Sequence, residues 1–186
     1  MTIELLTERT RIRLITTADL NSIHDLHSLP ETDAYNTLGI PKNIEETRSI
    51  IEAWINEHQK QKPHQYTFAI ESISNQGFIG LIGLKLGSEK YKRCELWFKI
   101  HSLHWNKGYA SEVLSKMLDY GFDELKLHRI EAGCAVANIG SIKVLEKAGF
   151  IREGRGRQIL PLKSGWSDNY EYAILETDER NSERRK

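Results

Sequence analysis

The feature that most constrains this chain is a strand followed directly by a helix whose entrance has no Ser, Thr or Asp. Without a capping side chain, the first backbone N–H groups of that helix have no partner within the chain. Unpaired N–H groups at the positive end of a helix dipole are suited to bind a phosphate or diphosphate. The strand is expected at residues 94–100, and the helix after it carries one regular apolar stripe, formed by Ala110, Val113, Leu114, Met117 and Leu118.

The loop that opens this helix, residues 105–110, strengthens the prediction of a diphosphate site. Gly108 lets an anion approach the backbone because no Cβ is in the way, and Lys107 adds positive charge at the rim. The alternative is an ordinary glycine turn whose amides bind water. Other phosphate-binding motifs do not compete: the sequence has no G-x-x-x-x-G-K-[ST], and Gly154-Arg155-Gly156 does not open a helix.

The order of the remaining elements predicts an α/β (α+β) protein with one mixed sheet and helices on both of its faces. Alternating polar and apolar residues predict strands, and helical spacing behind cap signals predicts helices. We place one domain at residues 8–177 and a frayed polar tail at residues 178–186. Strands are expected at residues 11–14, 66–70, 78–86, 94–100, 129–135, 151–162 and 169–175, helices at 16–29, 43–58, 110–126 and 138–148, and a loop at 30–43.

Three glycines carry structural information within these elements. Gly80 and Gly83 interrupt a strand, which indicates a bulge or the close approach of another part of the chain. Gly149 lies where a left-handed C-terminal helix cap is expected, and Phe150 then supplies the apolar contact of that cap.

Composition excludes several classes of function. The formal net charge of +0 argues against a nucleic-acid surface, and two cysteines are too few for a disulfide framework or a zinc knuckle. The N-terminal sequence lacks the basic and apolar regions of a signal peptide, and no apolar stretch approaches the ~20 residues of a membrane span. We therefore expect a cytoplasmic protein with no metal, no nucleic-acid partner and no membrane partner.

A second polar segment, residues 137–141, opens the next helix, with Asn138 as its predicted N-cap. Together with the strand at 95–100 and the loop pattern W-x-x-G-Y-A, the run from Ala137 through Ser141 to Phe150 resembles the GNAT acetyltransferase superfamily. Within it the chain is most similar to the RimJ/RimL-like branch, whose named members acetylate the N-termini of ribosomal proteins. The resemblance implies a mostly antiparallel sheet of about seven strands, in which the strands ending at Ile100 and Ala135 splay apart.

The same resemblance implies acetyl-CoA as co-substrate and a set of residues that hold it. Lys99 and Ile100 would contact pantetheine or the acetyl group through their backbone. Asn138 would hydrogen-bond pantetheine, and Ser141 would lie near the sulfur. Two departures from the family are Asn106, where Gly is frequent, and Leu160, where RimL carries a proposed base. The pyrophosphate would lie on Trp105, Asn106, Lys107, Gly108, Tyr109 and Ala110.

Acetyl transfer to an amine needs a proton acceptor and, for the thiolate, a proton donor. Glu95 is the first candidate for the base because it lies on the strand that leads into the implied gap; its alternative role is structural. Glu131 or a water relay are the competing bases. Ser141 is the candidate acid, and water is its alternative. The tyrosine that serves as acid in other branches has no counterpart here.

The acceptor is expected to be an amine-bearing small molecule or a protein N-terminus. Tyr35 and Trp166 lie in predicted loops and are candidates for the acceptor pocket, because aromatic side chains in loops are often ligand contacts. The alternative function is a CoA-binding regulatory module without turnover. The sequence leaves open a monomer or a homodimer.

Overall fold

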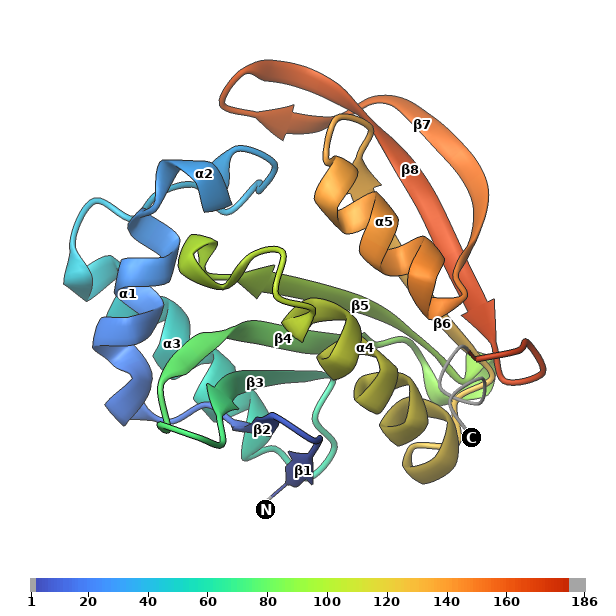
Figure 1. The fold of residues 1–186 in the computed structure, drawn as a ribbon, viewed down its shortest axis with the longest axis horizontal. Coiled ribbons are helices and arrows are strands. Elements are labelled where there is room, and N and C mark those ends of the chain that lie inside the picture. Colours follow the sequence, from blue (N-terminus) through green and yellow to red (C-terminus); the bar gives the residue numbers. More distant parts are fainter. Residues whose placement is uncertain (1–2, 181–186) are drawn as a thin grey trace.

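A single sheet forms the centre of the molecule in the computed structural model, which describes residues 3–180 (Figure 1). The order of its eight strands within this range is β1-β2-β3-β4-β5-β6-β8-β7. Neighbouring strands are antiparallel except β5 and β6, which are parallel. This confirms the predicted mixed, mostly antiparallel sheet. The strands are β1 Glu4–Leu6, β2 Thr10–Leu14, β3 Gln65–Ser72, β4 Phe78–Leu86, β5 Arg93–Ile100, β6 Arg129–Ala135, β7 Ile151–Leu162 and β8 Gly165–Leu175.

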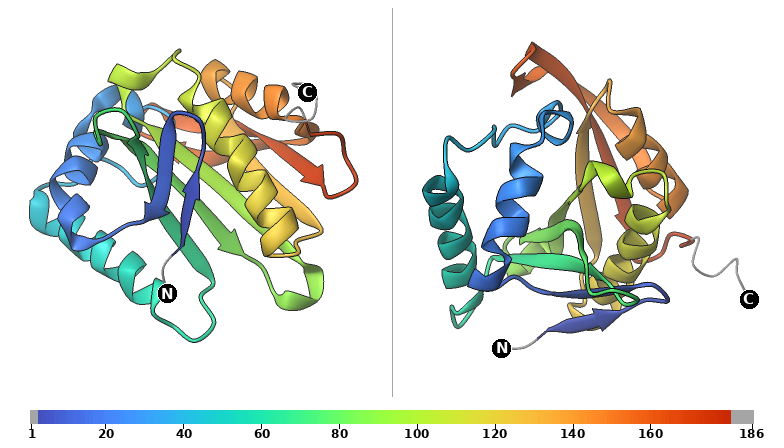
Figure 2. Two further views of the ribbon diagram at one scale, coloured as in Figure 1. Left: turned by 60° about the horizontal axis from the view of Figure 1, so that its bottom comes forward. Right: turned by 60° about the vertical axis from the view of Figure 1, so that its left-hand side comes forward.

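Helices cover both faces of the sheet, as predicted (Figure 2). The α1 and α3 helices pack on one face, where Ile23, Leu26 and Ile51 are fully buried against Ala69 and Leu81. The α4 and α5 helices pack on the other face. To the larger core α4 contributes the stripe of Val113, Leu114, Met117 and Leu118, and α5 contributes Leu145 and Ala148. The helices are α1 Leu20–Ser28, α2 Pro30–Asp33, α3 Ile44–His58, α4 Tyr109–Asp119 and α5 Ile139–Ala148, and a 3₁₀ turn spans Ser102–His104.

Four local features differ from the sequence expectations. The sheet has eight strands rather than about seven. The additional strand, β1, is only three residues long, lies before the predicted domain start at residue 8, and pairs with β2. Residues 30–33 form one helical turn, α2, with Pro30 at its start. A π-helical turn, Tyr120–Glu124, follows α4. The β8 strand begins at Gly165 rather than at residue 169.

The predicted polar tail, residues 178–186, lies outside the described residues from position 181 onward. Its described part is held against the end of α4, which differs from the expectation of a frayed tail. Arg180 forms an ion pair with Asp119 at 3.0 Å, and its guanidinium lies 5.5 Å from the ring centroid of Phe122.

The parallel pair at the centre of the sheet opens partway along its length. The β5 and β6 strands pair only from Arg93 to Glu95 on the β5 side, whereas β5 remains paired with β4 as far as Ile100. Beyond Glu95, the β5 edge that faces β6 therefore has no strand beside it. This confirms the predicted splay between the strands that end at Ile100 and Ala135.

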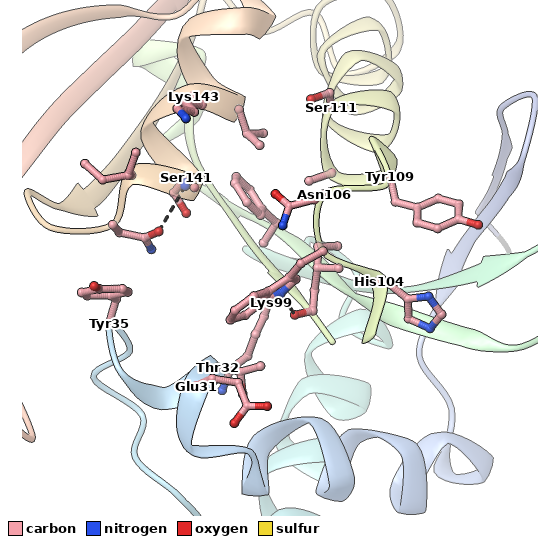
Figure 3. A pocket seen from close by; sticks show the side chains of 18 of the residues that line it. Glu31, Thr32, Tyr35, Lys99, His104, Asn106, Tyr109, Ser111, Ser141 and Lys143 are labelled. Carbon is pink, nitrogen blue, oxygen red and sulfur yellow. Dashed lines mark hydrogen bonds between the residues drawn. The ribbon is translucent and has the colours of Figure 1, made fainter. Parts of the chain in front are cut away.

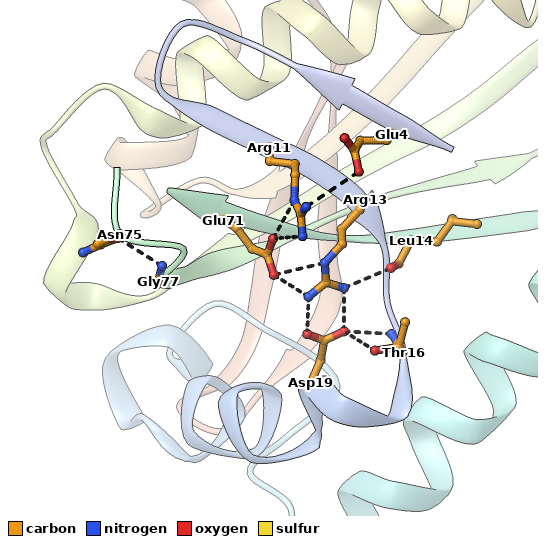
Figure 4. Close-up of polar contacts among 9 residues, drawn as sticks. All are labelled: Glu4, Arg11, Arg13, Leu14, Thr16, Asp19, Glu71, Asn75 and Gly77. Atoms are coloured by element: carbon orange, nitrogen blue, oxygen red, sulfur yellow. Dashed lines mark hydrogen bonds and ion pairs between the residues drawn. The ribbon is translucent and has the colours of Figure 1, made fainter. Parts of the chain in front are cut away.

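A charged cluster ties β2, β3 and the start of α1 together on the face opposite α4 (Figure 4). Arg13 donates to both carboxylate oxygens of Asp19, at 2.9 and 2.7 Å, and also pairs with Glu71. Burial opposes ionisation of Asp19, but the hydrogen bonds from Arg13 and from Thr16 outweigh it, so the pKa of Asp19 lies below its ordinary value.

The contribution of this cluster should be visible in the free energy of unfolding at acid pH. Because the pKa of Asp19 is lower in the folded than in the unfolded chain, its stabilisation is present above the ordinary carboxylate pKa. This stabilisation is lost as the pH falls through the lowered pKa of Asp19 in the folded chain. The variant Asp19→Asn should lower the free energy of unfolding at pH 7 by about 2–4 kcal/mol and flatten its decline below about pH 4. Urea denaturation across pH measures this. The exposed Glu45→Gln is the control, and an unaltered acid limb in Asp19→Asn would contradict the assignment.

Candidate active site

A cavity of about 660 Å³ lies where β5 and β6 separate (Figure 3). Its walls come from four places: the α2 segment, the last residues of β5, the entrance of α4 and the entrance of α5. Both α4 and α5 therefore present their N-terminal ends to the same space. Partial positive charge from two helix dipoles makes this cavity favourable for an anionic ligand.

The entrance of α4 is uncapped, as the sequence predicts. Gly108 occupies the N-cap position with φ +83°, and no side chain accepts a hydrogen bond from the first turn. The first helical bond runs from the Glu112 N–H to the Gly108 carbonyl at 3.1 Å. The N–H groups of Tyr109, Ala110 and Ser111 thus have no acceptor within the helix. Asn106 is also left-handed, with φ +59°, so the turn bends sharply to expose these donors.

A residue from the N-terminal segment holds this turn in place. Arg9 donates to Glu112 at 2.6 Å and to the Lys107 carbonyl at 3.0 Å, and its guanidinium lies 4.7 Å from the Tyr109 ring centroid. Burial opposes ionisation of Glu112, but the bonds from Thr7 and Arg9 outweigh it and lower its pKa. Sequence reasoning missed Arg9, because nothing local links it to a loop about a hundred residues away.

The entrance of α5 forms the facing wall. The Asn138 side chain accepts a hydrogen bond from the Ser141 N–H at 3.1 Å, so Asn138 caps the helix as predicted. Its carboxamide oxygen is therefore engaged, while its NH₂ group remains available as a donor. Figure 3 shows Ser141 and Asn106 on opposite sides of the cavity. A chain-like ligand held at the α4 turn would run past both α5 residues.

The end of β5 forms the floor of the cavity. Phe98, Lys99 and Ile100 line it. The Trp105 indole N–H donates to the Ile100 carbonyl at 2.7 Å, which fixes the path of the chain from β5 into the α4 turn. Trp105 therefore positions the turn through a bond that also occupies the Ile100 carbonyl.

Most of the predicted site residues meet at this cavity, and three do not. Glu95 is exposed and lies where β5 still pairs with β6, beside Glu131 in register. Trp166 is 66% exposed on the β7–β8 hairpin, and Lys107 contributes its carbonyl to Arg9. None of these three lines the cavity. The predicted residues that do line it are Tyr35, Lys99, Ile100, Trp105, Asn106, Gly108, Tyr109, Ala110, Asn138 and Ser141.

Charged residues that the sequence did not single out give the cavity two different ends. Lys143 and Lys147 of α5 line one end, and Glu31 of α2 lines the other. Glu31 accepts a hydrogen bond from Ser102 at 2.8 Å, which orients its carboxylate. Figure 3 shows Lys143 and Glu31 far apart across the cavity. This polarity suits an anionic ligand at the α5 end and a cationic one at the α2 end.

Comparison with known proteins identifies the family. The family model of the acetyltransferase (GNAT) domain matches residues 9–151. The uncharacterized N-acetyltransferase YoaA of Bacillus subtilis is 33% identical over 173 residues, which cover 93% of this chain and 97% of that protein. The chain belongs to the GNAT acetyltransferase family. It is accordingly an acetyltransferase enzyme.

Two further comparisons support the predicted branch and fold of this GNAT protein. The putative ribosomal N-acetyltransferase YdaF of B. subtilis is 29% identical over 53% of this chain and 54% of that protein. The crystal structure of spermidine N-acetyltransferase from Vibrio cholerae, in complex with CoA and spermine, superposes with a TM-score of 0.80. It covers 90% of this chain and 96% of that chain at 24% identity. The GNAT fold with its splayed strand pair is therefore confirmed.

Two kinds of feature are absent from the described part of the GNAT chain. Between residues 3 and 180, no helix combines the length and apolar character needed to cross a bilayer. Over the same range, no three His, Cys, Asp or Glu side chains gather as metal ligands would.

The placement of Glu95 leads to a mutational prediction. Because its exposed side chain lies outside the cavity, Glu95→Gln should change kcat by less than about threefold, well below the 10²–10⁴-fold typical of a lost general base. Initial rates of thiol release at several pH values test this. Glu131→Gln is the matched variant on the neighbouring strand. A loss of two orders of magnitude in Glu95→Gln alone would restore Glu95 as the base.

Proposed function

We propose that this enzyme transfers the acetyl group of acetyl-CoA directly to a primary amine. The observation that carries the proposal is the uncapped, glycine-containing entrance of α4 beside the open edge of β5. The α4 entrance supplies several aligned N–H donors for a diphosphate, and the open edge of β5 supplies backbone groups for an extended pantetheine arm. Use of acetyl-CoA by the family and the CoA bound in the V. cholerae neighbour support the same donor.

Each residue then has a defined role in binding. The N–H groups of residues 106–110 hold the diphosphate, and Lys143 and Lys147 lie where further phosphate charge would be neutralised. The backbone of Lys99 and Ile100 and the NH₂ group of Asn138 contact pantetheine. Trp105 keeps the α4 turn at the end of β5. This arrangement directs the thioester toward the centre of the cavity.

The chemical step needs little covalent help from the protein. A neutral amine attacks the thioester carbon, and a preorganised N–H group near Ile100 stabilises the oxyanion. The carbon–sulfur bond then breaks. Ser141, whose side chain lines the cavity, lies where it can donate a hydrogen bond or proton to the departing sulfur, with water as the alternative donor.

The acceptor enters from the α2 end in this proposal. Glu31 gives that end negative charge, and Tyr35 adds an aromatic surface, so a protonated amine is attracted to it. The names of two comparison proteins support two acceptor classes: a polyamine, from the V. cholerae enzyme, and a ribosomal protein, from YdaF. We therefore propose a small cationic amine or a protein N-terminal α-amine.

A panel of amines tests the proposal. Polyamines, aminoglycosides, amino acids and peptides with free or blocked N-termini are incubated with acetyl-CoA, and released thiol is measured. We expect turnover with at least one cationic primary amine and none with its N-acetylated form. Thermal stabilisation by CoA is measured in parallel, because a ligand of the native state raises the melting temperature. Stabilisation without turnover on any acceptor would favour a regulatory CoA-binding module; absence of both would contradict the proposed site.

A further inference from the structure

Three buried polar atoms without partners gather at the acceptor end of the cavity. Over residues 3–180, the buried side-chain nitrogen and oxygen atoms that make no hydrogen bond are His27 Nδ1, Asp33 Oδ1 and Lys99 Nζ. The side chains are 1%, 4% and 6% exposed, respectively. Electrostatic interactions join Lys99 to both of the others. Buried polar groups normally have partners, so three exceptions in one place indicate a functional rather than a structural arrangement.

The position of Lys99 links this cluster to the reaction site. Along β5, Trp97 and Lys99 project toward the face that α1 and α3 cover, and Trp97 packs there. The Lys99 stem lines the cavity, and Figure 3 shows its side chain running toward Thr32 and Glu31 of α2. Asp33 lies buried on the same turn, and His27 at the end of α1 packs its ring against Trp54. The amine end of Lys99 is thus buried beside α1 and α2, at the edge of the cavity that this residue lines.

No hydrogen bond fixes the lysine nitrogen in this position. It makes no hydrogen bond, so rotation of the terminal bonds of its four-carbon stem toward the cavity breaks none. A buried ammonium without a partner is also disfavoured relative to the neutral amine. The side chain therefore combines mobility with a charged form that is less favourable than in an exposed lysine, and both are properties of a proton acceptor.

We propose that Lys99 accepts the proton that the acceptor amine loses when it attacks the thioester. This inference rests on the proposed function. As the carbon–nitrogen bond forms, one N–H proton passes to Lys99 Nζ. The carbon–sulfur bond breaks, and the thiolate takes a proton from Ser141 or water. After the amide leaves, Lys99 returns its proton to solvent, and the group that protonated the thiolate regains one from solvent. The lysine replaces Glu95, whose side chain does not reach the cavity.

The charges around Lys99 agree with this role. Burial lowers the pKa of Lys99 to about 8, and Asp33 opposes part of that effect. Burial, followed by the charge of Lys99, lowers the pKa of His27 to about 3, so His27 binds a proton too weakly to serve as the base near pH 7. The other titratable groups on the surrounding elements are His24 and Asp25 of α1, Glu31 of α2, Tyr35, His101, His104, and Lys143 and Lys147 of α5. Asp25 pairs with His101 at 3.0 Å.

Two substitutions at Lys99 distinguish a general base from a residue that only supplies a fixed positive charge. Lys99→Met keeps the length of the side chain and removes a buried group without a partner, so it should fold and melt no lower than the wild type. Its kcat should fall about 100-fold with the KM for acetyl-CoA within about threefold. Lys99→Arg should lose a similar factor, because a guanidinium stays protonated at every accessible pH. Lys85→Met, on the exposed face of β4, is the control with unchanged rate.

The pH profile and a spectroscopic titration complete the test. Wild-type kcat/KM should rise with pH through about 8. This rising part of the pH profile should be absent in Lys99→Met. In protein labelled with ¹³C at lysine Cε, without acetyl-CoA, the resonance missing from Lys99→Arg should titrate near 8, whereas exposed lysines titrate at ~10.4.

Each outcome has a distinct meaning. Wild-type activity in Lys99→Arg, or an unchanged pH limb in Lys99→Met, would overturn the base assignment and leave the proposed function intact. A wild type that binds CoA and acetylates nothing would overturn both.

Discussion

Gly108→Val should weaken acetyl-CoA binding about 10- to 100-fold, because the variant acts on the diphosphate site in two ways. Gly108 has φ +83°, a conformation that a β-branched residue adopts only with strain. Its side chain would also project where the diphosphate approaches the exposed N–H groups, and a Cβ alone would lie 3.3 Å from the Arg9 guanidinium. Isothermal titration with CoA measures the affinity directly.

A matched glycine separates strain from ligand contact. Gly165 has φ +112° with no atom within 4 Å of a built Cβ, and it lies in the β7–β8 turn away from the cavity. Gly165→Val should therefore lower the melting temperature comparably and leave CoA affinity within about twofold of wild type. Equal CoA affinity in Gly108→Val and wild type would mean that the α4 turn does not hold the diphosphate.

Gly80→Ala should lower both stability and turnover, and it is the second large effect that we expect. A Cβ at Gly80 would lie 2.3 Å from the Lys99 carbonyl oxygen and 2.9 Å from the Ile100 Cα. These are backbone atoms, so β5 itself must shift at the point where it forms the cavity floor. We expect a loss of about 2–3 kcal/mol in the free energy of unfolding, or roughly 4–12 °C in melting temperature, with a fall in kcat/KM.

The control for this variant is a glycine beside a flexible side chain. A Cβ at Gly77 would meet the Asn75 carboxamide at 3.0 Å, and that side chain can turn away. Gly77→Ala should therefore cost less than about 1 kcal/mol and leave turnover unchanged. Thermal unfolding and thiol release measured on the same samples provide the comparison. Wild-type stability in Gly80→Ala would contradict the close strand approach.

Sequence patterns predicted the elements whose structure is determined locally. The missing cap before Tyr109, the Asn138 cap and the left-handed Gly149, at φ +100°, all depend on residues within a few positions of one another. Close approach at Gly80 and Gly83 was also predicted, because glycine is unfavourable in a strand without such a reason. The resemblance to the GNAT family then supplied the splay of β5 from β6.

The features that the sequence did not reveal depend on tertiary contacts. Arg9 reaches the α4 turn across almost a hundred residues, and the three-residue β1 strand is too short to show alternation. The sequence favours Glu95 because its strand leads into the gap, but β5 still pairs with β6 at this residue, so its side chain lies outside the cavity. Lys99 was predicted only through its backbone, because burial of its amine depends on α1 and α2 folding over it.

A crystal structure of the protein with CoA shows directly whether the entrance of α4 holds the diphosphate. We expect diphosphate oxygens within about 2.7–3.2 Å of at least two backbone nitrogens among residues 106–110, with pantetheine along the open edge of β5 and past Asn138. A diphosphate bound elsewhere, with the α4 amides contacting only solvent, would contradict this expectation.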